Sequence, residues 1–224
     1  MNLHRIFLLL LGVCVGVNLP AQTARHDHDP PPAWSLRKDQ DGIKVYGRTG
    51  DNSGFDDLKV ETILPGRLSS LAAVILDVGN YPNWSFNSEK AYILKTIGPA
   101  ELYFYSLVHS PWPANDRDLA VHLVIRQDSS TRKLYISADE IANFIPEKKG
   151  IVRVPLSVER WVVTPLPGDR ISISYELRLN PGASAPAWLI NLFAVKGPFE
   201  TFSHLREQLK VPKYYGATVP FFRN

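Results

Sequence analysis

Between residues 34 and 180, apolar and polar residues alternate with a period of two along much of the chain, which is typical of strands with one dry and one wet face. The alternation is clearest over residues 117–128 and 170–180. Consecutive strands joined by short turns predict an antiparallel meander. Nine strands are expected, at residues 36–38, 43–48, 58–64, 91–97, 101–109, 117–128, 132–139, 154–163 and 170–180.

Two segments follow a helical period instead. Residues 67–77 predict a short helix, and residues 79–88 after it read as a loop. Residues 181–210 predict a long helix, in which every residue from Ala187 to Val195 except Asn191 is apolar. The face expected to be buried carries, at intervals of three or four, Trp188, Leu192, Val195, Phe199, Phe202, Leu205 and Leu209.

Gly197-Pro198 interrupts this long helix, and a proline there predicts a kink or a break between two half-helices. An apolar helix of this length needs a partner to bury it, and the dry face of the strands supplies one. The pattern therefore predicts an α+β fold, in which a strongly curved antiparallel sheet wraps around the C-terminal helix.

The N-terminal segment differs from the rest of the chain. Residues 1–22 combine a basic Arg5, an uncharged apolar run and small residues after Pro20, which predicts a cleaved signal peptide. Residues 23–33 read as a flexible linker, and its alternating His and Asp residues are too few and too mobile to favour a metal site. We expect a secreted or periplasmic protein. The single cysteine, Cys14, lies in the leader, so no disulfide is expected in the mature chain.

Composition and motifs exclude several classes of function. Without the leader the chain has 24 Lys and Arg against 22 Asp and Glu, too even a balance for a nucleic-acid-binding surface. The sequence has no nucleophile elbow, zinc-binding His-Glu-x-x-His, phosphate-binding glycine loop or dinucleotide fingerprint. We therefore expect no catalysis, no cofactor and no metal.

Several segments resemble the START domain, the steroidogenic-acute-regulatory-protein-related lipid-transfer family. Residues 110–118 read SPWPANDRD, similar to the Pro-x-Pro and Arg-Asp segment of that family. DGIKVY at residues 41–46, the loop around Trp84, NPG at residues 180–182 and PAWLIN at residues 186–191 agree in order.

The resemblance covers residues 34–210 and leaves residues 211–224 as a tail. It implies a helix-grip fold with an internal hydrophobic tunnel that holds one lipid, such as a sterol or phospholipid, and carries it without a cofactor. With its leader, the chain looks like a secreted or periplasmic, bacterial-type member of the family.

Candidate ligand contacts come from the strands, the Trp84 loop and the last helix. Arg117 lies on the same face of its strand as apolar residues, where an unpaired charge is unfavourable. It is therefore expected either to meet a lipid headgroup or to pair with Asp116 or Glu159. Asp118, on the opposite face, is expected to bond backbone amides. Asn191 either binds the ligand or ties the helix to the sheet. The full set is Trp84, Tyr103, Tyr105, His109, Arg117, Tyr175, Trp188, Asn191, Leu192 and Val195.

Aromatic residues in the loops and tail suggest contact with a membrane. Trp84 and Trp112 would either insert into a membrane interface or plug the tunnel, and a buried position is favoured for Trp112. The tail either touches membrane or packs on the domain.

The preferred function is binding and transfer of a lipid or other hydrophobic molecule by a monomer, with transient membrane contact and no nucleic-acid partner. One alternative is a helix-grip enzyme such as a polyketide cyclase or dehydratase, with His109 or a tyrosine as acid or base. Another is an interaction protein with a vestigial cavity.

Overall fold

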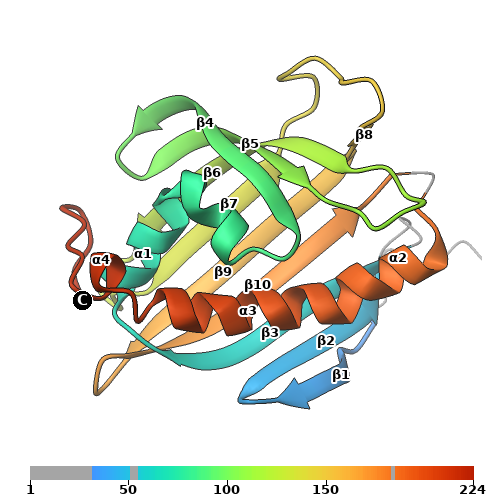
Figure 1. Cartoon of the computed structure of the whole chain (residues 1–224). Coiled ribbons are helices and arrows are strands. Elements are labelled where there is room, and N and C mark those ends of the chain that lie inside the picture. Colours follow the sequence, from blue (N-terminus) through green and yellow to red (C-terminus); the bar gives the residue numbers. More distant parts are fainter. Residues whose placement is uncertain (1–31, 51–54, 183–184) are drawn as a thin grey trace, which may run out of the picture. The chain divides into compact units, whose positions relative to one another are not determined.

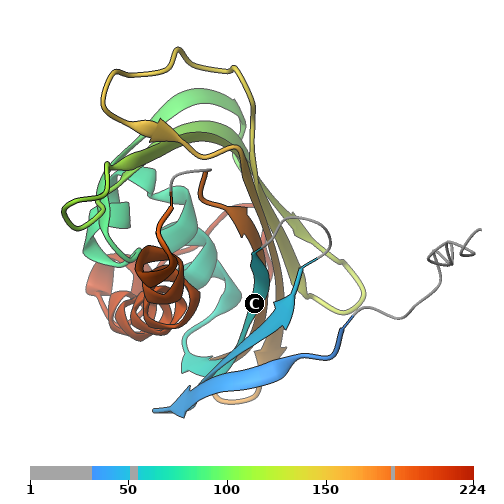
Figure 2. The ribbon, with the colours of Figure 1, turned by 90° about the vertical axis from the view of Figure 1, so that its right-hand side faces the viewer.

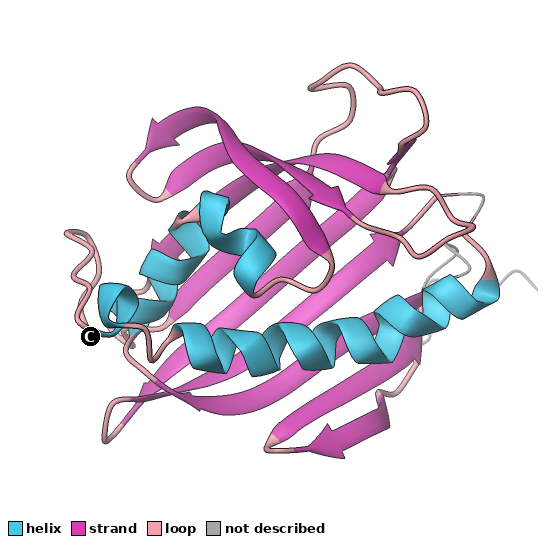
Figure 3. Ribbon diagram, viewed as in Figure 1, coloured by secondary structure: helices cyan, strands magenta, loops and turns pink. Residues whose placement is uncertain are grey.

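The computed structural model describes residues 32–224 apart from residues 51–54 and 183–184. The predicted signal peptide and most of the predicted linker lie outside the described residues. The described part is built on one antiparallel sheet, with its helices gathered on the concave face (Figures 1 and 3). Seen from the side, the sheet curves around the C-terminal helix (Figure 2), which confirms the predicted α+β helix-grip arrangement.

The sheet has ten strands in the order β1-β2-β3-β10-β9-β7-β6-β5-β4, and the short β8 pairs with β6. All nine predicted strands are present, and β8, the one parallel partner, was not predicted. In chain order the strands are β1(Ser35–Gln40), β2(Ile43–Thr49), β3(Asp56–Pro65), β4(Ser88–Gly98), β5(Glu101–Val108), β6(Arg117–Gln127), β7(Leu134–Glu140), β8(Val152–Arg153), β9(Leu156–Leu166) and β10(Arg170–Asn180).

The meander is interrupted once. After β3 the chain crosses the concave face through α1(Leu68–Leu76) and the 3-10 helix η1(Val78–Asn83), and then starts again at the opposite edge with β4. It returns strand by strand until β10 pairs with β3. The crossing places the α1–η1 segment over the sheet, so the expected loop at residues 79–88 is partly helical and helps to cover the concave face.

The C-terminal helix consists of α2(Ala187–Asn191), the π-helical turn η2(Leu192–Lys196) and α3(Gly197–Gln208). The backbone stays helical at Lys196 and Gly197, so the expected interruption takes the form of a wide turn rather than a break. Pro198 has no N–H to donate to the preceding turn, and a π turn is a common way to accommodate such a residue.

The π turn also changes which face of the helix is buried. Phe202, Leu205 and Leu209 are buried as expected, but upstream of η2 the buried residue is Leu189, while Trp188 is 42 % exposed. The prediction that the Trp188, Leu192 and Val195 face is the buried one is wrong, because it assumed an uninterrupted α-helical period. The wider turn shifts the upstream face by about one residue.

The tail folds back onto the domain. α4(Pro212–Tyr215) lies beside α1, where the buried Tyr214 donates a hydrogen bond to Asp77 (2.6 Å). Farther along, the side chain of Asn224 accepts the backbone N–H of Ser69 (3.0 Å). Of the two alternatives for the tail, the structure therefore shows packing on the domain. Within the described residues, no helix is long and apolar enough to span a bilayer.

Candidate functional site

A cavity of about 210 Å³ lies between the concave face of the sheet and the helices. Its floor consists of alternate residues of β5, β6, β7, β9 and β10, because side chains at every second position of a strand point to the same face. η1, the Trp84 loop, η2 and α3 supply the other wall. Most of the lining is apolar or aromatic, as in sites that bind hydrophobic ligands.

The helical wall approaches the Trp84 loop closely. The Phe86 and Phe193 rings meet edge to face with centroids 5.5 Å apart. A β-carbon at Gly197 would lie 3.2 Å from the Phe86 ring, so the glycine allows this approach. The side chain of Thr201 accepts the backbone N–H of Phe86 (3.0 Å), which ties the helix to the loop.

Arg117 lines the cavity at the start of β6 and is buried. Its guanidinium donates to the hydroxyl of Ser110 (3.0 Å) and to the carbonyl oxygens of Asn115 (2.6 Å) and Pro181 (3.4 Å). Burial lowers the pKa of Arg117, although the nearby Asp116 opposes that shift. Among the described residues no carboxylate forms an ion pair with it, so the expected pairing with Asp116 or Glu159 is wrong and neutral acceptors take its place.

Glu159 of β9 also faces the cavity and is half-buried. Its carboxylate accepts a long hydrogen bond from the indole N–H of Trp161 (3.4 Å) and another from the phenol of Tyr175. Burial raises the pKa of Glu159 to about 7, and hydrogen bonding from Trp161 and Tyr175 only partly offsets this rise. Burial also raises the pKa of Tyr175. The cavity thus holds an acid that is near its midpoint of ionisation at neutral pH.

Three of the predicted contacts line this cavity: Trp84, Arg117 and Tyr175. Trp84 is buried against Tyr81, with ring centroids 4.9 Å apart. Asn191 lines a second hollow of about 220 Å³, which shares Leu179, Pro181 and Phe193 with the first. Trp188, Leu192 and Val195 contribute to neither wall in the described part of the chain.

β5 presents the opposite face from the one expected. Phe104, Ser106 and Val108 line the cavity, whereas Tyr103 stacks on His122 with centroids 4.5 Å apart. Tyr105 is buried and donates to Asp118 (3.2 Å). Both faces of β5 carry large apolar or aromatic side chains, so alternation alone could not identify the inner one.

The residues around Tyr105 form a polar network outside the cavity. Asp118 pairs with Arg153 (2.7 Å), so the expectation that it bonds backbone amides is wrong. The ammonium of Lys148 lies 3.8 Å from the centre of the Tyr105 ring. These contacts hold the segment before β8 against the sheet, which is a structural role.

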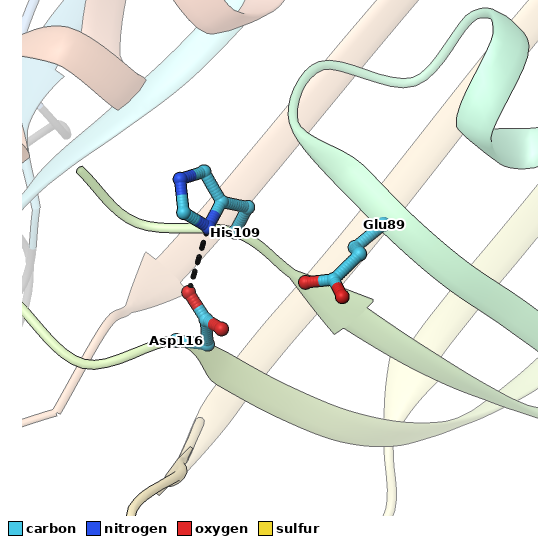
Figure 4. A group of neighbouring side chains, drawn as sticks. All are labelled: Glu89, His109 and Asp116. Carbon is cyan, nitrogen blue, oxygen red and sulfur yellow. Dashed lines mark ion pairs between the residues drawn. The ribbon is translucent and has the colours of Figure 1, made fainter.

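His109 does not line the cavity and is exposed. It lies beside Glu89 and Asp116 (Figure 4). Its Nδ1 is 3.0 Å from Asp116 Oδ1, and Glu89 completes a group whose possible ligand atoms all lie within 4.8 Å of one another. Asp116 is also held by the backbone N–H of Ser110 (2.9 Å). The spacing of the three side chains would suit a divalent cation, but none of them lines the cavity.

Trp112 is 91 % exposed at the tip of the loop between β5 and β6. The expectation of a buried Trp112 is wrong, because the short loop projects beyond the sheet. Sequence reasoning also missed Glu159 and Phe193 as cavity residues. Glu159 could have been found, because it alternates with Ser157, Trp161 and Val163 on one face of β9. Phe193 could not, since its position depends on the π turn.

Comparison with known proteins agrees with this architecture. The START domain model matches residues 30–213. An uncharacterized protein of Pseudomonas aeruginosa is 31 % identical over 174 residues, which cover 77 % of this chain and 85 % of that one. The phosphatidylcholine transfer protein of Bos taurus is 27 % identical over 195 residues, covering 83 % of this chain and 87 % of its own.

Solved structures show the same fold. The STAR-related lipid transfer protein of Xanthomonas axonopodis superposes with a TM-score of 0.72 at 29 % identity, covering 79 % of this chain and 98 % of that one. Human StAR-related lipid transfer protein 5 gives a TM-score of 0.70 at 15 % identity, over 79 % and 86 % of the two chains. With a family model that spans most of its length, the chain belongs to the START domain family.

Proposed function

We propose that the protein binds one lipid or similar hydrophobic molecule in the cavity and carries it, without catalysis. The observation that carries this proposal is the largely apolar cavity between sheet and helix. Burying about 400 Å² of apolar ligand surface at about 25 cal/mol per Å² contributes roughly 10 kcal/mol before the costs of association, enough for useful affinity. Relatives named as lipid transfer proteins support the same function.

The helical wall is proposed to move when the ligand enters. Ligand sites commonly enclose about 300–1,000 Å³, whereas this cavity has about 210 Å³. Phe193 is shared with the second hollow, so movement of η2 would join the two spaces. The π turn η2 is the proposed place of this movement, because π turns are rare and are frequent at functional sites.

The cyclase alternative relies on His109 or a tyrosine as its acid or base. His109 is exposed and pairs with Asp116 outside the cavity, whereas Tyr175 lines the cavity. The relatives named as lipid transfer proteins favour the carrier, which remains the proposal. We further propose that it is exported from the cytoplasm, because residues 1–22 follow the pattern of a leader. A monomer is proposed as the carrier, since one chain by itself forms the cavity.

Transient membrane contact is proposed at Trp112. Its ring is almost fully exposed, and indole rings favour the interface between lipid and water. It lies on the β5–β6 loop, just before the cavity residue Arg117. This position would bring the cavity close to a membrane surface when a lipid is exchanged.

A vesicle-to-vesicle transfer assay with fluorescent sterol and fluorescent phospholipid tests these proposals. Ala138→Phe fills the cavity floor and should reduce lipid uptake at least tenfold, while Ser137→Phe, on the opposite face of β7, should not. Trp112→Ala should slow transfer several-fold with uptake unchanged. Thermal unfolding verifies that each variant folds. No uptake of any lipid by the wild-type protein would overturn the carrier.

A further inference from the structure

Two neutral donors, the Trp161 indole and the Tyr175 phenol, bond to Glu159, and among the described residues no cation forms an ion pair with it. Three aromatic rings cluster on this side of the cavity, where the centroid of Trp161 lies 4.8 Å from that of Tyr175 and 5.1 Å from that of Phe202. The Trp161 N–H is 3.4 Å away, at the limit of a hydrogen bond. A buried carboxylate normally has several donors or a cation beside it.

The charged groups around Glu159 do not neutralise it. Arg160 and Asp139 influence its pKa with opposite signs, and they pair with each other on the outer face. Burial and the nearby Glu159 raise the pKa values of two phenols, Tyr175 of β10, which hydrogen-bonds to Glu159, and Tyr81 of η1. Within the described chain, the part of the C-terminal helix that lines the cavity presents no charged side chain.

Arg117 is too far along the floor to neutralise Glu159. Glu159 is paired with Ala138 of β7, and Ala138 is paired with Leu123 of β6. Leu123 therefore marks the position of Glu159 along the strands, and it follows Arg117 by six residues. At about 3.3 Å per residue, the backbone positions of Arg117 and Glu159 are about 20 Å apart along the strand direction. The cavity therefore has two separate charged positions, and the floor between them is apolar apart from Ser106 and Ser157.

We propose that Glu159 accepts a hydrogen bond from the ligand, so that the preferred ligand is an amphiphile with a hydroxyl or ammonium donor at the Glu159 end of the cavity. This rests on the proposed function, because it assumes that the cavity holds a lipid. A carboxylate has about four acceptor positions, more than Trp161 and Tyr175 occupy, so it can also accept a hydrogen bond from the ligand. A ligand with no donor at this position would leave the carboxylate facing an apolar group, which is unfavourable.

Because Glu159 ionises, the affinities for an alcohol and for an amine should depend differently on pH. Burial places its pKa at about 7, so the fraction of carboxylate rises from pH 6 to pH 8. A long-chain amine remains cationic over this range, so its affinity should rise by up to about tenfold. An alcohol gains no ion pair and should change less.

The test measures displacement of diphenylhexatriene, an apolar dye without donors, from the full chain. The competitors are 1-dodecanol, dodecylamine and dodecyl methyl ether, which share the chain and differ in the donor. Wild-type protein should prefer the alcohol or the amine to the ether by at least tenfold. Glu159→Leu should reduce this preference to less than threefold, while Glu176→Leu, on the exposed face of β10, should leave it intact.

Glu159→Gln keeps the shape and an acceptor oxygen but cannot ionise. It should retain a preference for the alcohol and lose the pH dependence seen with the amine. If wild-type protein binds the dye, but the alcohol and the amine displace it no better than the ether does, the role of Glu159 is overturned while the carrier function stands. If the dye and all three competitors fail to bind, the carrier function itself is overturned.

Discussion

The two walls of the cavity differ in what they contribute. The sheet wall carries Arg117, Glu159 and Tyr175, on strands held by continuous antiparallel pairing. The helical wall contributes mainly apolar and small side chains, with Thr201 as its polar member among the described lining residues of η2 and α3. Under the proposed carrier function, we expect the sheet to determine ligand selectivity and the helix to control access.

Few polar contacts tie the helical wall to the rest of the domain. Thr201 accepts the backbone N–H of Phe86, Gln208 accepts the side-chain amide of Asn80 (2.9 Å), and Arg206 donates to the carbonyl of Asp41 (2.6 Å). A wall held this way can move without disrupting the sheet, since local opening costs least where few hydrogen bonds must break.

The largest expected effect comes from removing Arg117. Arg117→Ala leaves the Ser110 hydroxyl and the carbonyls of Asn115 and Pro181 without their donor. At 1–3 kcal/mol per buried group, the free energy of unfolding should fall by about 4 kcal/mol. Denaturant unfolding measures the change, and Arg117→Lys should recover part of it. A loss below about 1 kcal/mol would show that Arg117 is not a structural part of the sheet wall.

Glu159→Gln should have the next largest effect, with the opposite sign. The pKa of Glu159 is raised from 4.5 to about 7 in the folded protein. The folded state then binds more protons than the unfolded state between these values, so wild-type stability falls as pH rises from about 4.5 to 7. The variant lacks this loss and should be more stable than wild type by about 3 kcal/mol at pH 8.

At pH 4 the Gln variant and the wild type should differ little, because Glu159 is protonated in both states. Thermal or urea unfolding across this range measures the pH dependence. A constant difference between the two proteins at every pH would contradict the raised pKa. Glu176→Gln, on the outer face of the neighbouring strand, serves as the matched control.

The smallest effect is expected on the helical wall. Thr201→Val removes the acceptor for the Phe86 N–H and should cost about 1 kcal/mol of stability. Dissociation of bound dye should become several-fold faster, because the helix is less firmly tied to the Trp84 loop. Ser203→Ala is the control, since that hydroxyl donates within α3 to the carbonyl of Phe199 (2.8 Å). Equal dissociation rates in both variants would show that Thr201 does not control release of the dye.

The fold could be predicted from sequence to a large extent, but much of the site could not. Alternation located nine strands and placed Arg117 and Tyr175 on the inner face, because each lies in a strand with one clearly apolar face. It failed for β5, where Tyr103 and Phe104 are equally good candidates for the interior. The alternation of side chains along a strand identifies the buried face only when the two faces differ in polarity.

By itself, the sequence determined the strands, the long apolar C-terminal helix and their packing, because local periodicity and the need to bury apolar surface act along the chain. Tertiary structure decided which residues face the cavity. The π turn before Pro198 replaced the Trp188 and Leu192 face of the helix with Leu189 and Phe193. The packing of sheet and helices placed Glu159 in a largely apolar cavity with only neutral hydrogen-bond donors, and burial there raises its pKa.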